Sequence, residues 1–318
     1  MSARKLRIGF VMDPLAHIDV EKDTTFVFLE EAGRRGHQCL YIAPEELAIR
    51  RGTPEARMRP VAVRRVPGDH FTLGPARRDA LEDLDVVLLR KDPPFDMEFF
   101  FDTHAASLAD PARVLILNDP RGLRDANEKL YALLFPEVVP ESLVTADIEL
   151  LKEFLRELGG EMIVKPLDGC GGRGIFHVKA DDRNVNAILE ASTHQGNTRI
   201  MAQRYLLEVR RGDKRIIVID GEPQGAVLRV PTDAESRSNF HVGGSAARAP
   251  LTARDREICE RLAPRLREDG LIFVGLDVIG DYLTEVNVTS PTGVQEINAL
   301  DGVKIEATML DWIERHAP

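Results

Sequence analysis

The clearest hydrophobic pattern lies near the end of the chain, where two aliphatic runs flank a short polar turn. Residues 270–279 (GLIFVGLDVI) and 282–288 (YLTEVNV) lie on either side of Gly280 and Asp281, a pattern that predicts a β-hairpin. A three-residue loop, 280–282, would place the aliphatic side chains of both strands on one continuous face. A two-residue loop would shift the register by one and bring Glu285 among them, so we predict the three-residue loop.

The opposite face of this hairpin carries Asp277, Glu285 and Asn287. Two carboxylates and an amide oxygen form a hard ligand set, which suits Mg²⁺, or Mn²⁺, bound to substrate phosphates better than zinc or copper. The alternative is a solvated polar face of an antiparallel hairpin. Other parts of the chain decide between the two.

The first 120 residues alternate short apolar runs with helical periodicity. Strands are predicted at 6–12, 38–42, 85–89 and 113–117, and a helix at 24–35, which is typical of an α/β domain. Open α/β sheets place ligand groups beyond the carboxyl ends of their strands. Asp13 and Arg90 follow two of these strands and are therefore candidate binding residues. The turn after Arg90 has an alternative explanation, because Pro93 and Pro94 by themselves make a stiff loop.

A glycine-rich loop separates two predicted strands in the middle of the chain. Residues 161–179 read EMIVKPLDGCGGRGIFHVK, with a strand ending at Lys165 and another at 175–178. The glycines match G-x-G-x-x-G, but a strand follows where a dinucleotide-binding fold requires a helix. The loop either binds phosphate through backbone N–H groups beside Lys165 or is a plain β-turn. Cys170 has no neighbouring base, so we do not assign it a nucleophilic role.

Several further segments carry candidate groups. A helix is predicted at 125–135, with Lys129 on its polar side, and a strand at 199–206 could present Tyr205 and Leu206 to an adenine ring. The hairpin predicted at 212–231 carries Asp213, Lys214 and Arg215 at one end and Arg229 at the other. Residues 231–249 are polar and aperiodic, either disordered or a lid over substrate. Helices are predicted at 148–158, 184–192, 251–269 and 304–316.

Composition narrows the class of protein. The 318 residues are 43% hydrophobic and 30% charged, enough for two or three modules with their own cores. A net charge of −10 argues against a nucleic-acid partner. Three separated cysteines favour reduced thiols in a cytoplasm, and the lack of a long apolar run predicts no membrane association.

Together these segments resemble a known superfamily. The runs NEKLY (with Lys129), VKPLDGCGGRGIF (with Lys165), MAQRYL, GDKRIIVIDGEP and DVIGDYLTEVNVTSPTG are similar to the successive motifs of ATP-grasp enzymes. The runs GFVMDPLAHIDVEKDTTF, LLRKDPPFD and VNVTSPTG resemble, more narrowly, the bacterial glutathione synthetases. The resemblance covers nearly the whole chain.

The resemblance implies an α/β (α+β) fold. An N-terminal parallel-sheet pre-ATP-grasp domain, residues 1–122, precedes a two-lobed ATP-grasp domain of antiparallel sheets and helices. The small lobe with the glycine-rich flap spans 123–200, and the C-terminal lobe with the metal hairpin and the lid spans 201–318. It also implies a homo-oligomer, dimer or tetramer.

The implied reaction joins γ-glutamylcysteine to glycine and converts ATP to ADP and phosphate through an acyl phosphate. The resemblance implies that the ATP phosphates are bound by Lys129, Lys165, Gly171 and Gly172, and that adenine and ribose are bound by Gln203, Tyr205, Leu206 and Asp213. It implies that the metal is bound by Asp277, Glu285 and Asn287, and that the charge of the transferred phosphoryl group is neutralised by Arg215 and Arg229. It also implies that the other substrates are contacted by Asp13, Arg90, Asn239, Ser290 and Pro291.

One departure keeps other functions open. The family has Arg-Gly-Asn in the lid, and here Arg237, Ser238 and Asn239 occupy those positions. A serine in place of the glycine could alter lid closure or the acceptor amine. An ATP-grasp ligase with a different acceptor, or a nucleotide-binding regulatory protein without turnover, therefore remains an alternative. The intact set of Asp277, Glu285 and Asn287 argues against the regulatory protein.

Overall fold

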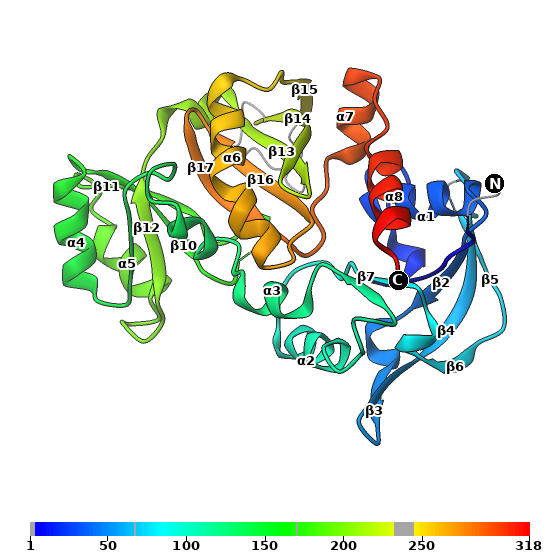
Figure 1. Cartoon of the computed structure of the whole chain (residues 1–318). Coiled ribbons are helices and arrows are strands. Elements are labelled where there is room, and N and C mark those ends of the chain that lie inside the picture. The colour runs from blue at the N-terminus through cyan, green and yellow to red at the C-terminus, as the bar shows by residue number, and fades with distance from the viewer. Residues whose placement is uncertain (1–3, 67, 170, 232–244) are drawn as a thin grey trace.

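Three β-sheets form the framework of the protein (Figure 1). The computed structural model describes residues 4–66, 68–169, 171–231 and 245–318. The sheets follow one another along the chain, within residues 7–117, 142–204 and 213–287. Helices and antiparallel sheets accompany the N-terminal sheet, so the predicted fold class is confirmed. No helix within the described ranges is long and apolar enough to cross a membrane.

The first sheet has a parallel centre. Its main order is β3-β4-β2-β1-β7-β8, where β2, β1, β7 and β8 run parallel and β4 is antiparallel to β2. The strands are β1 (Arg7–Val11), β2 (Gln38–Ile42), β3 (Leu47–Arg50), β4 (Thr53–Val63), β5 (Phe71–Leu73), β6 (Arg77–Ala80), β7 (Val86–Leu89) and β8 (Leu115–Leu117). The helices are α1 (Thr24–Arg34), α2 (Met97–Ala106) and α3 (Pro120–Asp125). The extension β3 to β6 and helix α2 were not predicted, because their short apolar segments lack a clear period.

The second sheet is antiparallel and small. Its order is β11-β10-β12-β9, formed by β9 (Ser142–Thr145), β10 (Glu161–Pro166), β11 (Phe176–Lys179) and β12 (Ile200–Arg204). Helices α4 (Ile148–Glu157) and α5 (Val185–Ser192) contribute Leu151, Leu155 and Leu189 to a separate hydrophobic cluster beneath it. The sheet therefore has its own core, and the glycine-rich loop lies at its edge between β10 and β11.

The third sheet has the order β15-β14-β13-β16-β17 and is antiparallel throughout. It consists of β13 (Asp213–Ile219), β14 (Glu222–Val230), β15 (Ser245–Arg248), β16 (Phe273–Ile279) and β17 (Tyr282–Asn287), with α6 (Ala253–Glu268) and α7 (Val294–Asp301) packed against β14. Two large hydrophobic clusters each contain residues from this sheet and from the first sheet. The first and third sheets therefore share their cores.

The last helix returns to the beginning of the chain. Helix α8 (Ile305–His316) packs against α1, as Figure 1 shows. Arg35, at the end of α1, donates to Asp311 (2.7 Å), Glu314 (3.1 Å) and the carbonyl oxygen of Ala307 (3.0 Å). The C-terminal helix is thereby attached to the N-terminal sheet.

The hairpin register near the acidic residues agrees with the prediction, but the predicted turn is wrong. Leu276 pairs with Val286 and Asp277 with Glu285, whereas Val278 pairs with Leu283 and only two residues, Gly280 and Asp281, form the turn. A bulge at Thr284 absorbs the extra residue. A bulge places two residues of one strand opposite one residue of the other. The hairpin can therefore have a two-residue turn and still keep Glu285 opposite Asp277, away from the aliphatic face.

Two other predictions need correction. The helix predicted at 125–135 is wrong: α3 ends at Asp125, and a 3-10 turn (Tyr131–Leu134) follows after a gap. The side-chain oxygen of Asn127 accepts from the backbone N–H groups of Lys129 and Leu130, which favours a turn over a helix. Within the predicted aperiodic segment 231–249, residues 245–248 form strand β15. Most of the segment, with Asn239, lies outside the described residues.

Candidate functional site

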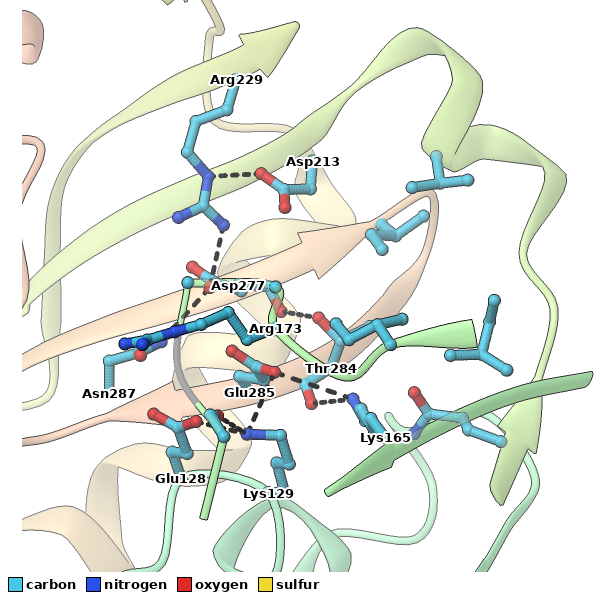
Figure 2. A pocket seen from close by; sticks show the side chains of 18 of the residues that line it. Glu128, Lys129, Lys165, Arg173, Asp213, Arg229, Asp277, Thr284, Glu285 and Asn287 are labelled. Atoms are coloured by element: carbon cyan, nitrogen blue, oxygen red, sulfur yellow. Dashed lines mark hydrogen bonds and ion pairs between the residues drawn. The ribbon is translucent and has the colours of Figure 1, made fainter. Parts of the chain in front are cut away.

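A cavity of about 1280 Å³ lies where the three sheets meet. Strands of the second and third sheets line most of it, and Asp92 and Pro93, which follow β7 of the first sheet, line one end. Figure 2 shows the charged side chains that point into this pocket. The pocket brings together the following predicted site residues: Lys129, Lys165, Gly171, Gly172, Gln203, Tyr205, Leu206, Asp213, Arg215, Arg229, Asp277, Glu285, Asn287, Ser290 and Pro291.

Asp277 is held between two arginines. Arg215 donates to both carboxylate oxygens, through Nε and, at 2.9 Å, through Nη2, and Arg229 Nη2 lies 2.8 Å from Oδ2. Arg229 also donates to Asp213. Burial by itself would raise the pKa of Asp277, but the two guanidinium charges hold that pKa below its ordinary value. Asp277 is therefore a carboxylate at neutral pH, and the pair of arginines is fixed by it.

Two buried lysines lie beneath Glu285. Lys129 and Lys165 are 2% and 5% exposed, and their Nζ atoms lie 3.7 Å and 3.9 Å from Glu285 Oε1. Burial lowers the pKa of Lys165, partly offset by the negative charge of Glu285. Long cationic side chains are rarely buried without a partner for their charge. These two lysines thus form a compact positive site that an anionic ligand can reach from the pocket.

Glu128 adds a carboxylate that the sequence analysis did not assign. Its side chain contacts Lys129 Nζ directly, and the backbone N–H of Val286 donates to its carbonyl oxygen at 2.8 Å. Burial, and then the charge of Glu285, raise the pKa of Glu128. In the sequence, only its position next to Lys129 pointed to Glu128 as a pocket residue. Acidic residues beside a lysine are too common for that position to predict a role.

The oxygen cluster, defined as Asp277, Glu285 and Asn287, fits magnesium carried by a nucleotide. Asp277 and Glu285 are directly paired across β16 and β17, and the Asn287 amide lies 3.3 Å from Asp277 Oδ2. Among the described residues, no group of three or more His, Cys, Asp or Glu side chains could hold a metal ion by itself. Mg²⁺ takes one or two carboxylates and completes its coordination with phosphate oxygens and water. The cluster supplies that incomplete set.

The glycine-rich loop closes over the lysines from the second sheet. The carbonyl oxygen of Gly169 accepts from Lys129 Nζ at 2.7 Å. Gly171 and Gly172 have positive φ angles of 64° and 75°, conformations that glycine adopts without a steric penalty. Both glycines line the pocket, where their backbones can approach a phosphate closely.

The residues predicted for adenine lie at the end of β12 and directly after it, and they line the pocket. Gln203 and Leu206 are almost fully buried. The ring of Tyr205 stacks on His177, with centroids 3.9 Å apart and planes 15° from parallel. The sequence analysis did not assign His177, because a lone histidine on a short strand gives no specific signal. This part of the pocket therefore offers two stacked rings and the side chain of Gln203, whose amide nitrogen donates to Ser142 Oγ at 2.8 Å.

The predicted substrate residues divide into two groups. Ser290 and Pro291 line the pocket, but Asp13 and Arg90 do not. Arg90 is 5% exposed and donates to the carbonyl oxygens of Thr289 (3.2 Å) and Pro291 (3.4 Å). Asp13 accepts from the backbone N–H of Asp92 at 2.7 Å. Both residues therefore hold the backbone of segments that line the pocket. Asn239 lies outside the described residues.

Two family models match this chain. Residues 6–124 match the model described as prokaryotic glutathione synthetase, N-terminal domain, and residues 128–302 match prokaryotic glutathione synthetase, ATP-grasp domain. Among curated proteins, a glutathione synthetase of Brucella melitensis is 47% identical over 97% of this chain and 98% of its own length. A glutathione synthetase of Xanthomonas axonopodis is 48% identical over 98% and 99%.

Solved structures share the fold at low identity. A D-cycloserine synthetase has a TM-score of 0.68 and 16% identity over 97% of this chain and 99% of its own. A peptide-associated ATP-grasp ligase of Chryseobacterium gregarium, solved with ADP and a leader and core peptide, has a TM-score of 0.65 and 14% identity over 98% of both chains. An ATP-grasp ligase solved with magnesium and ADP has a TM-score of 0.61 and 18% identity over 98% and 97%.

Proposed function

This chain belongs to the prokaryotic glutathione synthetase family, and on that premise we propose that its pocket joins γ-glutamylcysteine to glycine with the energy of ATP. The single observation that carries the proposal is the convergence of the oxygen cluster with buried Lys129 and Lys165 under a glycine-rich loop. This convergence supports the proposal, because a triphosphate with bound magnesium requires both oxygen ligands for the metal and cations for the phosphates around one volume.

The chemistry follows from the inertness of a carboxylate toward an amine at neutral pH. Transfer of the γ-phosphoryl group of ATP to the carboxylate of γ-glutamylcysteine gives an acyl phosphate, and the amine of glycine then displaces phosphate. Such a transfer requires mainly positioning and charge neutralisation from the protein. Lys129 and Lys165 would bind the α- and β-phosphates, with Gly171 and Gly172 covering them.

Asp277, Glu285 and Asn287 would hold magnesium. A magnesium ion held there would supply positive charge that stabilises the charge developing on the phosphoryl group. The oxygens of Asp277 also accept from Arg215 and Arg229. A carboxylate oxygen has more than one acceptor direction, so these contacts leave room for a metal.

Arg215 and Arg229 would stabilise the phosphoryl group in transfer. Each is bound to Asp277 and therefore keeps a fixed orientation without substrate. Fixed donors stabilise developing charge without a cost of reorganisation. Gln203, Tyr205 and Leu206 would bind adenine, with Asp213 at the ribose. Ser290 and Pro291 would contact the dipeptide. Arg90 would position the backbone of residues 289–291, and Asp13 would position the backbone at Asp92.

The small-molecule substrates are ATP, γ-glutamylcysteine and glycine. A homo-oligomer, a cytoplasmic location and the absence of nucleic-acid or membrane partners stay predictions. So does the division of the chain at residues 122 and 200.

Phosphate release tests the function directly. We expect phosphate to appear only when ATP, magnesium, γ-glutamylcysteine and glycine are all present, with tripeptide formed in equal amount. A chelator should abolish release, and excess Mg²⁺ should restore it. Release that does not depend on γ-glutamylcysteine, or that another amine supports better than glycine, would contradict the proposal.

Glu285→Gln tests the metal site. The substitution removes one ligand charge and should lower the rate of tripeptide formation by about 100-fold or more, since metal ligands and charge-stabilising donors contribute on this scale. The matched control is Glu149→Gln, because Glu149 is an exposed glutamate on α4 whose side chain pairs with Lys152 and does not line the pocket. Its rate should equal that of the wild type.

A further inference from the structure

The end of the first sheet reaches the hairpin that carries the oxygen cluster. Asn118 directly follows β8 and is only 5% exposed. Its side-chain oxygen accepts from the backbone N–H groups of Ile272 and Phe273, both at 2.9 Å. Its side-chain nitrogen donates to the carbonyl oxygens of Phe273, at 2.9 Å, and Val288, at 2.8 Å. The amide thus makes all four of the hydrogen bonds that its two donors and its acceptor oxygen allow.

These bonds join the two strands of the hairpin where their own pairing ends. Phe273 is the first residue of β16, and Val288 directly follows the last residue of β17. The pairing of β16 with β17 ends at Gly275 and Asn287. Beyond that pair, the side chain of Asn118 connects one strand to the other. A group on the first sheet therefore holds the two strands together at the end next to Asn287, and we call these contacts of Asn118 the hairpin junction.

Asn287 is the member of the oxygen cluster that directly precedes this junction. Its side-chain nitrogen donates across the hairpin to the carbonyl oxygen of Gly275 and to Asp277 Oδ2, both at 3.3 Å. The orientation of the Asn287 amide therefore depends on the separation of β16 and β17. Asn118 does not line the pocket, so it can act on a ligand there only through the hairpin.

We propose that Asn118 is a positioning residue, which joins β16 to β17 and thereby holds the oxygen cluster in the arrangement that magnesium requires. The inference rests on the proposed function, in which the cluster binds magnesium together with the nucleotide. Mg²⁺ demands near-ideal octahedral geometry, so a small change in the separation of the strands weakens its binding. Without the Asn118 amide, Val288, Ile272 and Phe273 would each lose a hydrogen-bond partner in a buried place, which favours separation of the strand ends.

Asn118→Ala tests the proposal through ADP binding to the full-length protein, below the temperature at which the variant unfolds. With magnesium present, we expect ADP affinity to fall by about tenfold, and kcat for tripeptide formation by a similar factor, as is typical when a residue that orients metal ligands is removed. In excess chelator, ADP affinity should change less than about twofold, because Lys129 and Lys165 make no contact with the hairpin junction and independent sites do not couple.

Asn298→Ala is the matched control. The amide of Asn298 also joins two segments, since its nitrogen donates to Glu306 and its oxygen accepts from the backbone N–H of Ile305 at 3.0 Å. It links α7 to α8 and does not line the pocket. Its removal should lower the free energy of unfolding, but the ratio of ADP affinities with and without magnesium should equal that of the wild type.

A second measurement uses the wild-type protein and so does not depend on the folding of a variant. If the hairpin junction strengthens magnesium binding, then magnesium binding must strengthen the junction by the same factor. ADP with magnesium should therefore slow amide exchange at Ile272 and Phe273, which donate to Asn118, by up to about tenfold relative to ADP alone.

Three outcomes overturn the inference. Asn118→Ala with wild-type ADP affinity in magnesium would remove Asn118 from the metal site, and equal losses with and without magnesium would make it a general structural residue. Exchange at Ile272 and Phe273 that magnesium does not change would show that the junction and the metal are not coupled. In each case a wild-type protein that forms tripeptide leaves the proposed function intact. A wild-type protein that binds ADP with magnesium but forms no tripeptide would instead reject the proposed function.

Discussion

At the scale of single residues, one carboxylate, Asp277, has a structural role and a proposed role in the reaction. Asp277 is 4% exposed and binds two buried guanidinium groups. Removing one partner of a buried ion pair leaves an uncompensated charge, which costs far more than loss of a surface pair. Glu285, on the neighbouring strand, is only partly buried and faces the lysines. The two acids of the oxygen cluster should therefore differ in their effect on stability.

Asp277→Asn should lower the free energy of unfolding at pH 7 by about 3–5 kcal/mol, because buried Arg215 loses its counter-charge and buried Arg229 keeps only Asp213. Glu285→Gln should cost less than this, because Glu285 is partly exposed and Lys129 keeps Glu128 as a partner, while it lowers the rate by about 100-fold or more. Denaturant unfolding of both variants measures the contrast. Equal stability losses would mean that Asp277 is not the structural anchor of the two arginines.

The pKa of Asp277 also sets a pH dependence. The arginine charges lower this pKa below its unfolded value of 3.8 despite burial. A lowered folded pKa stabilises the protein above the unfolded pKa, and the stabilisation is lost as the pH falls below it. As the pH falls from about 4 toward 3, Asp277→Asn should therefore lose less stability than the wild type, because the unfolded carboxylate is protonated near 3.8.

At the scale of elements, the hairpin of β16 and β17 is fitted closely to its neighbours. A Cβ atom at Gly275 would lie 2.7 Å from Pro291 Cβ and 3.0 Å from Arg215 Cδ. Glycine here thus lets Pro291 and Arg215, which both line the pocket, approach the strand. The bulge at Thr284 works on the same element, since it allows a tight turn and keeps Glu285 opposite Asp277.

Gly275→Ala should push Pro291 and Arg215 away from the strand. Overpacking of this kind costs about 1–3 kcal/mol, and displacement of Arg215 should also lower kcat. Gly33→Ala is the control, because its Cβ would meet no atom within 4 Å and the exposed position lies in α1; its stability should be unchanged or higher. Activity of Gly275→Ala equal to the wild type would show that Arg215 tolerates the shift.

At the scale of the whole molecule, the two ends of the chain are joined by charge as well as by packing. Arg35 binds Glu31 on its own helix and Asp311 and Glu314 on α8. Hydrogen bonds from Arg34, then those from Arg35, lower the pKa of Glu31 from 4.5 to about 2, although burial opposes the shift. The contact between α1 and α8 therefore contains a carboxylate that is ionised at any physiological pH.

Arg35→Ala should lower the free energy of unfolding by about 1–3 kcal/mol, since it removes several hydrogen bonds between charged groups. Amide exchange in α8 should rise in the same variant. Arg34→Ala removes an exposed partner of the same Glu31 and should have a smaller effect. Exchange in α8 that is unaffected by Arg35→Ala would show that apolar packing alone holds the helix.

The same cluster predicts acid sensitivity. Glu31 has a folded pKa below its unfolded value, so its stabilisation is complete above about pH 4.5 and is lost as the pH falls toward 2. The protection of α8 amides, expressed relative to the intrinsic exchange rate at each pH, should therefore fall across that window.

The amino-acid order alone was enough to locate most of the pocket. Strands β2 and β10 to β14, the glycine-rich loop and the pairing of Asp277 with Glu285 follow from periodicity and turn residues, which act over a few neighbours in the chain. The motifs around Lys129 and Lys165 then predicted a nucleotide site. Local signals of this kind need no knowledge of the rest of the fold.

Contacts between distant segments decided the remainder. Arg90, which the sequence predicts to bind substrate, is buried and donates to the carbonyl oxygens of Thr289 and Pro291. Asp277 binds one arginine from β13 and one from β14. Glu128 and Arg173 became pocket residues only because the second and third sheets face one another. Such roles depend on which strands meet in space, and interactions between residues far apart in sequence leave no periodic trace in it.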